Sequence, residues 1–226
     1  MPHLVSLEQV EGRWVAFVPA LAGCFASAGT RDAALALLPE AVRSYLIWRR
    51  DKGDASVASD QEPTFEIEEI VREWPDPAHP EYIVSAFFAA DAPPLTGQDI
   101  SLGVRLLDWA YADLLTAGAL PADVLGEKVE GDWSVAGILT HCSHAEWWYL
   151  HRLGLAPAQK EPSTWRERFT LAHQQLVTVL PTLEGVTRIV LADCELWSPR
   201  KMLRRALWHE RDHTAHIHQF RLRLGV

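Results

Sequence analysis

Near the end of the chain, two histidines lie four residues apart with a glutamate between them. The residues His209, Glu210 and His213 form an H-E-x-x-H pattern. On a helix this spacing separates the two imidazoles by about 40° around the axis, so both can reach one metal ion. In zinc peptidases the glutamate of the same pattern acts as a general base. The spacing indicates metal chemistry, and the peptidases are the first class to test.

The peptidase interpretation lacks a third ligand downstream of the pattern. A metzincin would carry a glycine and a third histidine where this chain has His216 and Gln219. A zincin that uses a later glutamate needs an acidic residue, and no Asp or Glu follows His213 in the sequence. Because a catalytic zinc usually has three protein ligands, the third must come from an upstream segment.

The upstream segment HCSHAE supplies two histidines, His141 and His144. They are about 60° apart around a helix, so spacing alone leaves either one as the third ligand. Glu146 could support a ligand from behind or lie exposed to solvent. Cys142 points about 100° away from His141, which favours packing over metal binding.

Two further residues of the last segment are candidates for catalysis. Glu210 could accept a proton from metal-bound water or thiol, or form a salt bridge at the surface or between subunits. His216 falls near the stripe of the histidine pair and could serve the site, or lie buried with its hydrogen bonds satisfied. A basic cluster begins the same segment; it could attract an anionic part of a substrate, but a solvated face is the expectation: Arg200, Lys201, Arg204 and Arg205.

Four amphipathic segments must position these side chains. Their apolar residues recur at three- and four-residue steps, and they span roughly 98–117, 134–153, 163–181 and 199–223. Ser134 and Ser198 are predicted N-caps of the second and fourth segments, and Pro199 occupies the favoured first helical position. The pattern predicts an antiparallel four-helix bundle whose second and fourth helices direct histidines into the core.

The N-terminal part is predicted to be α+β. Runs of β-forming residues separated by turns predict strands at 3–7, 14–18, 24–27, 65–71 and 82–88. Thr30 is the predicted cap of a helix that Pro39 should kink or split. Residues 1–95 hold 15 acidic and 7 basic side chains, whereas residues 96–226 hold 15 and 14. Together with a Pro-rich segment at 91–97, this asymmetry predicts two domains, 1–92 and 98–226.

Composition excludes several function classes. The net charge of −9 disfavours nonspecific binding to nucleic acids or anionic membranes. No stretch is long and apolar enough for a membrane span, and the start of the chain lacks the features of a signal peptide. The three cysteines do not suggest a disulfide framework. We therefore expect a cytoplasmic protein.

The stretch WVAFVPALAGCFASAGTRDAALALLPEAVRSYLIW resembles the HicB family of antitoxins. The resemblance covers residues 2–50 and implies a small sheet with one helix, whose family partner is an RNA-cleaving toxin. Pro39 and the lack of a following DNA-binding tail depart from the family pattern. One hypothesis is therefore a non-enzymatic antitoxin, regulatory or partner-binding protein in which the helical bundle is only structural.

The stretches WSVAGILTHCSHAEWWYL and WSPRKMLRRALWHERDHTAHIHQ resemble the DinB-like superfamily of metal-binding four-helix bundles. The resemblance implies three metal ligands, His141, His209 and His213. It also implies a divalent ion, zinc or nickel above all, and a small-molecule substrate such as a low-molecular-weight thiol. The main hypothesis is a metal-dependent thiol S-transferase or hydrolase, with Glu210 and His216 as catalytic candidates. Both resemblances imply a homodimer.

Overall fold

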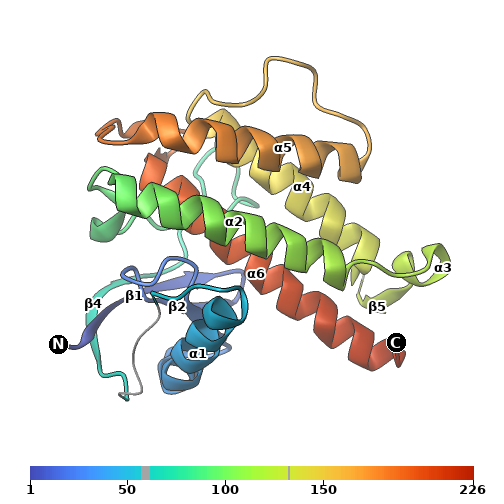
Figure 1. Cartoon of the computed structure of the whole chain (residues 1–226), viewed down its shortest axis with the longest axis horizontal. Helices are drawn as coiled ribbons and strands as arrows, with labels where there is room; N and C mark the ends of the chain where they lie inside the picture. Colours follow the sequence, from blue (N-terminus) through green and yellow to red (C-terminus); the bar gives the residue numbers. More distant parts are fainter. Residues whose placement is uncertain (57–61, 132) are drawn as a thin grey trace. The chain divides into compact units, whose positions relative to one another are not determined.

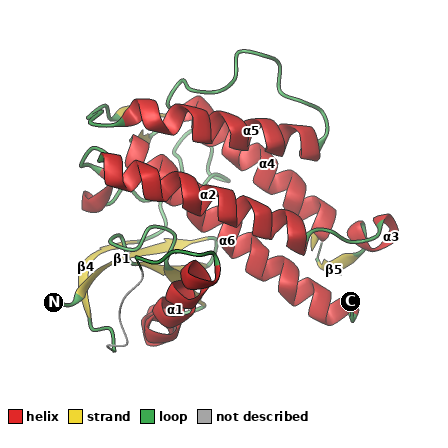
Figure 2. Cartoon of the chain, viewed as in Figure 1, coloured by secondary structure: helices red, strands yellow, loops and turns green. Residues whose placement is uncertain are grey.

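The computed structural model describes residues 1–56, 62–131 and 133–226. It shows a β-sheet with one helix in the N-terminal part, followed by a region of four main helices (Figures 1 and 2). The predicted α+β fold class is confirmed. The chain divides into two compact units, Met1–Ala92 with Leu191–Leu196 and Pro93–Val190 with Trp197–Val226. Within the described ranges, the model contains no helix that is long and apolar enough to cross a membrane.

The sheet of the first unit has four strands in the order β3-β2-β1-β4. The strands are β1 (His3–Val10), β2 (Arg13–Phe17), β3 (Phe25–Ala28) and β4 (Phe65–Val71). The first three form an antiparallel meander, and β4 pairs with β1 in parallel. Glu11 and Gly12 both have positive φ in the first turn, where the chain must reverse tightly. These four strands confirm the predictions for the corresponding runs.

Helix α1 (Arg31–Asp51) packs against β2 and β3. Thr30 caps it by accepting a hydrogen bond from the backbone N–H of Ala33 at 3.2 Å, as predicted. Pro39 lies inside the helix, which runs continuously through it, so the predicted split is wrong. Proline removes only one backbone donor, and buried residues on both sides of it, such as Leu38 and Val42, anchor the helix. The helix therefore continues through Pro39.

The strand predicted at 82–88 is wrong. This segment forms only an isolated bridge between Ile83 and Pro75. Its backbone instead satisfies a buried carboxylate, because the N–H of Ala86 donates to Glu8 Oε1 at 2.7 Å. Phe88 packs 5.6 Å from Phe17, measured between ring centroids. The β-forming composition of the segment therefore reflects its burial against the sheet face rather than strand pairing.

The second unit contains α2 (Gly97–Ala117), α4 (Val135–Arg152), α5 (Trp165–Val179) and α6 (Pro199–Leu224). These helices confirm all four predicted segments. Helix α2 packs on α5 and α6, and α4 packs on the same two helices, so the four form a closed ring around one core. The core includes Leu114, Ile138, Phe169 and Ile217, one residue from each helix.

Short elements connect the main helices. They are η1 (Ala89–Asp91), α3 (Ala122–Leu125), β5 (Lys128–Glu130), β6 (Trp133–Ser134), η2 (Leu180–Leu183), β7 (Val190–Ala192) and β8 (Glu195–Trp197). Strands β5 and β6 pair directly before α4, and β7 and β8 pair directly before α6. Each of these two helices therefore follows a short hairpin.

The starts of α4 and α6 are capped in the same way. Ser134 Oγ accepts from the N–H of Gly137 at 3.1 Å, and Ser198 Oγ accepts from the N–H of Lys201 at 3.0 Å. Both caps confirm the sequence prediction, and Pro199 takes the first position of α6. The two histidine-bearing helices thus begin at defined residues, which fixes the positions of the side chains along them.

Candidate metal centre

Three histidine side chains from two helices meet in the second unit. His141 comes from α4, and His209 and His213 come from successive turns of α6. One ring nitrogen from each lies within 4.8 Å of those of the other two. The Nε2 atoms of His141 and His209 are 2.9 Å apart. We call His141, His209 and His213 the histidine cluster.

The separations within the histidine cluster fit the needs of a metal ion. Zinc binds imidazole nitrogen at about 2.0–2.1 Å, so two ligands of a tetrahedral site lie about 3.3 Å apart. The observed nitrogen separations, from 2.9 Å to at most 4.8 Å, bracket that value. Neutral imidazole is also the commonest metal ligand among side chains. The histidine cluster could therefore hold a divalent metal ion.

The structure distinguishes between the two histidines of the upstream segment. His144 is exposed, and its Nδ1 lies 2.8 Å from Glu161 Oε1. Glu161 also contacts Arg168 at 2.7 Å, so His144 belongs to a polar group on the outside of α4 and α5. His141 is half-buried and faces α6. The rotation of α4 about its axis therefore directs His141 towards α6 and His144 towards solvent, a choice that sequence spacing alone left open.

The three members of the histidine cluster differ in burial. His209 and His213 are only 4% and 9% exposed. The ring of Tyr149 lies edge-on to His209, with centroids 6.0 Å apart, and packs on the buried Trp197. Exposure increases towards His141, which is half-buried. A ligand from solvent would therefore approach the histidine cluster from the His141 side.

The catalytic candidate Glu210 is completely buried, so the alternative of a surface salt bridge is wrong. It pairs with Glu146 of α4, which is 1% exposed. In the described parts of the chain, no donor reaches any of the four carboxyl oxygens of these two residues. Since two ionised carboxylates cannot hydrogen-bond to each other, the contact requires a shared proton. We call Glu146 and Glu210 the carboxyl pair.

Burial governs the ionisation of the carboxyl pair. Burial raises the pKa of Glu146 to about 7, and a hydrogen bond from Glu210 partly opposes this shift. Burial, followed by the negative charge of Glu146, raises the pKa of Glu210 well above its ordinary value. Both carboxyls therefore resist ionisation, and the two residues hold a proton as a pair. The two glutamates lie far apart in the sequence, and no local pattern predicts the pair, because it depends on how α4 and α6 align.

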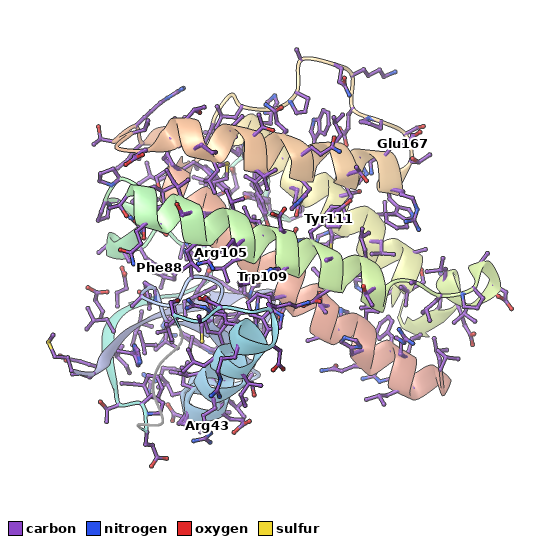
Figure 3. The ribbon with its side chains drawn as sticks, in the orientation of Figure 1. Arg43, Phe88, Arg105, Trp109, Tyr111 and Glu167 are labelled. Carbon is purple, nitrogen blue, oxygen red and sulfur yellow. The ribbon has the colours of Figure 1, made fainter. Side chains whose placement is uncertain are left out.

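Polar residues of α2 and α5 lie in the same part of the bundle. Tyr111, labelled in Figure 3, stacks on His173 with ring centroids 4.0 Å apart. Burial raises the pKa of Tyr111, and the negative charges of Glu146 and Glu210 add to the shift. His173 Nε2 lies 3.0 Å from Asp108 Oδ1. All four helices therefore contribute polar side chains to the interior of this unit.

Cys142 packs in the core, as expected. It is completely buried, and burial together with the nearby charge of Glu146 raises the pKa of its thiol well above the ordinary value. A thiol that resists ionisation is a poor nucleophile and a poor metal ligand. Cys142 therefore acts as an apolar core residue beside His141.

His216 lies next to the histidine cluster but outside the group that could hold an ion. It is half-buried, and its ring centroid is 6.0 Å from that of His213. Its other side contacts Phe220 edge-on at 4.5 Å. His216 is the nearest imidazole to His213 that lies outside the histidine cluster along α6, so it could exchange a proton with a molecule bound there.

The basic cluster at the start of α6 is not a solvated face. Lys201 is completely buried, and Arg204 and Arg205 are each 9% exposed. The Lys201 ammonium lies 4.6 Å from the ring centroid of Trp197, and the Arg205 guanidinium lies 4.2 Å from that of Trp208. Cation–π contacts therefore contribute to the inward positions of Lys201 and Arg205. The expectation failed because neighbouring tryptophans let charged side chains pack against aromatic surface.

Comparison with known proteins identifies no relative. No family model, curated protein or solved structure matches this chain.

Proposed function

We propose that this protein binds one divalent metal ion through His141, His209 and His213 and catalyses a metal-dependent reaction of a small molecule. Thiol S-transfer and hydrolysis are the two reaction types that we propose. The observation that carries the proposal is the convergence of three ring nitrogens from two helices within 4.8 Å. Three imidazole nitrogens this close together can all donate to a single cation, and three histidines with an open position form a common catalytic metal site.

The donor set suits several ions. Imidazole ligands accommodate zinc, nickel, copper and iron, and we propose zinc or nickel. Three protein ligands leave at least one position for water or for the sulfur of a low-molecular-weight thiol. A metal ion there would lower the pKa of the bound group and so supply a nucleophile at neutral pH.

The surrounding residues have different roles in this proposal. His216 accepts the proton that the bound water or thiol releases, because it is half-buried and lies 6.0 Å from His213. Glu210 is completely buried and paired with Glu146 of α4. In this proposal it is a positioning residue of α6 and does not touch the substrate. The resemblance of this unit to DinB-like bundles supports the same ligand set, and the resemblance also implies a homodimer.

Metal content tests the proposal directly. Purified wild type, His209→Ala and His144→Ala would be stripped with chelator, reloaded with zinc, dialysed and analysed by mass spectrometry. His144 is the matched control because it is an exposed histidine on the same helix as His141. We expect about one zinc per chain in wild type and His144→Ala and almost none in His209→Ala. Equal zinc content in all three proteins, each with a native circular dichroism spectrum, would overturn the proposal.

Turnover separates the enzyme from its alternative. Zinc-loaded protein should consume a thiol together with an electrophile, and His216→Ala should slow that reaction without loss of bound zinc. The alternative is the antitoxin-like binding protein, and the observation that favours it is the four-stranded sheet with one helix in the first unit. Co-purification of a small toxin-like protein, with no metal-dependent turnover, would support that alternative instead.

A further inference from the structure

Trp133 is a large apolar side chain that stays partly exposed beside the histidine cluster. Trp133 is 39% exposed. Its ring centroid lies 5.4 Å from that of His141 and 6.3 Å from that of His213. It also lies 6.2 Å from the ring of His216. One indole thus contacts rings of both helices that form the candidate metal centre.

The backbone around Trp133 holds the indole in place. Trp133 belongs to β6, which pairs with β5, and Glu130 is its partner in that pairing. The next residue, Ser134, caps α4 through a hydrogen bond to Gly137. A side chain between a paired strand and a capped helix has little backbone freedom. The partly exposed indole is therefore attached to an ordered backbone beside His141, the most exposed member of the histidine cluster.

We propose that Trp133 binds a planar apolar group of the substrate, so that the substrate class is an aromatic molecule with a metal-binding group. This inference rests on the proposed function, because the metal-binding group must reach the histidine cluster. Trp133 lies beside the rings of His141 and His216, and His216 continues the aromatic surface to Phe220 at 4.5 Å. In the described parts of the chain, no arginine or lysine side chain lies over the indole. Ring stacking rather than charge would select the substrate.

Two hydroxamates that differ only in an aromatic ring test this inference. Acetohydroxamate and benzohydroxamate carry the same metal-binding group, so both should bind the zinc-loaded protein. Isothermal titration calorimetry would measure both dissociation constants. We expect benzohydroxamate to bind about tenfold more tightly than acetohydroxamate, since one aromatic contact contributes about a factor of ten.

Two variants assign that preference to the indole. Trp133→Ala should lose the preference for benzohydroxamate and keep its zinc and its affinity for acetohydroxamate. Trp133→Phe is the matched control, because it retains a ring and should retain most of the preference. Equal affinity of wild type for the two hydroxamates, or an undiminished preference in Trp133→Ala, would overturn this inference alone. Failure of either hydroxamate to bind a protein that also fails to retain zinc would instead overturn the proposed function.

Discussion

The histidine cluster and the carboxyl pair lie on the same two helices, yet they differ in access to solvent and in the positive charge that each can hold. The histidine cluster is most exposed at His141, where a cation could enter and replace the hydrogen bond between His141 and His209. The carboxyl pair is completely enclosed, and it keeps a proton in place of a cation. Sites on the same pair of helices can therefore favour a metal or a proton, depending on donor type and access to solvent.

The comparison also shows why the carboxyl pair does not complete a larger metal site. Ionising both Glu146 and Glu210 would place two negative charges in the core with no cationic partner among the described residues. Such a state is costly, and the raised pKa of each group expresses that cost. The histidine cluster loses no comparable energy when neutral. The three imidazoles can therefore donate to a metal ion without first losing a buried charge, whereas the carboxyl pair retains a proton.

The largest predicted effect is the loss of metal-linked stability. Zinc at about 1,000 times its dissociation constant should raise the free energy of unfolding of wild type by about 4 kcal/mol. His213→Ala should lose nearly all of this gain, because it removes one of the three ligands. Urea denaturation with and without zinc measures the difference. His144→Ala is the control and should respond to zinc like wild type; the same response from His213→Ala would count against a shared ion.

The next effect is a fall in the stability of the metal-free protein as pH rises. Burial raises the pKa of Glu146 from its ordinary 4.5 to about 7 in the folded protein. The folded protein thus holds this proton more tightly than the unfolded chain, so the stabilisation is full below pH 4.5 and is lost as pH rises through about 7. Between pH 5 and 8 the free energy of unfolding should fall by about 2–3 kcal/mol from this group alone.

The variant Glu146→Gln isolates that contribution. Glutamine cannot ionise, so the variant should lack the part of the pH dependence that belongs to Glu146. Urea denaturation in chelator at pH 5, 6, 7 and 8 would compare it with wild type. Parallel curves for the two proteins would show that Glu146 does not titrate in the folded state as proposed.

A smaller effect should appear as coupling between the two carboxyl residues. Glu146→Gln and Glu210→Gln each disrupt the same proton-sharing contact, so the double variant should differ from the sum of the singles. For contacting polar residues the coupling is about 1 kcal/mol. A double-mutant cycle at pH 8, measured by urea denaturation in chelator, gives the value. Strict additivity would mean that the two side chains do not interact.

The smallest effects should come from the caps of the two helices. Ser134→Ala and Ser198→Ala should each lower the free energy of unfolding by about 1 kcal/mol. Zinc affinity should change little in either variant, because both helices are also held by their buried faces. Thermal denaturation and zinc titration together test this. A large loss of zinc binding in Ser134→Ala would mean that the cap itself orders His141.

Local patterns predicted much of the fold. The N-caps Thr30, Ser134 and Ser198 all hold, because a capping hydroxyl acts within one helical turn. The strand predicted at 82–88 failed, because β-forming residues can be buried without strand pairing. The split that was one of the two outcomes predicted at Pro39 failed, because packing on both sides outweighs one lost hydrogen bond.

The candidate site was predictable only in part. The spacing of His209 and His213 placed both on one face of α6, since that relation lies within a single helix. Which histidine of α4 faces them depends on the rotation of α4 about its axis, which spacing did not decide. The carboxyl pair and the position of Trp133 depend on contacts between separate elements, and no local sequence pattern predicts such contacts. The resemblance to DinB-like bundles supplied the choice of His141.

The most direct test of the central claim is the anomalous diffraction of crystals of the zinc-loaded protein, measured at the zinc absorption edge. One strong peak should lie about 2.1 Å from a ring nitrogen of each of His141, His209 and His213. A peak that lacks any one of these three contacts, or zinc bound elsewhere on the chain, would contradict the account.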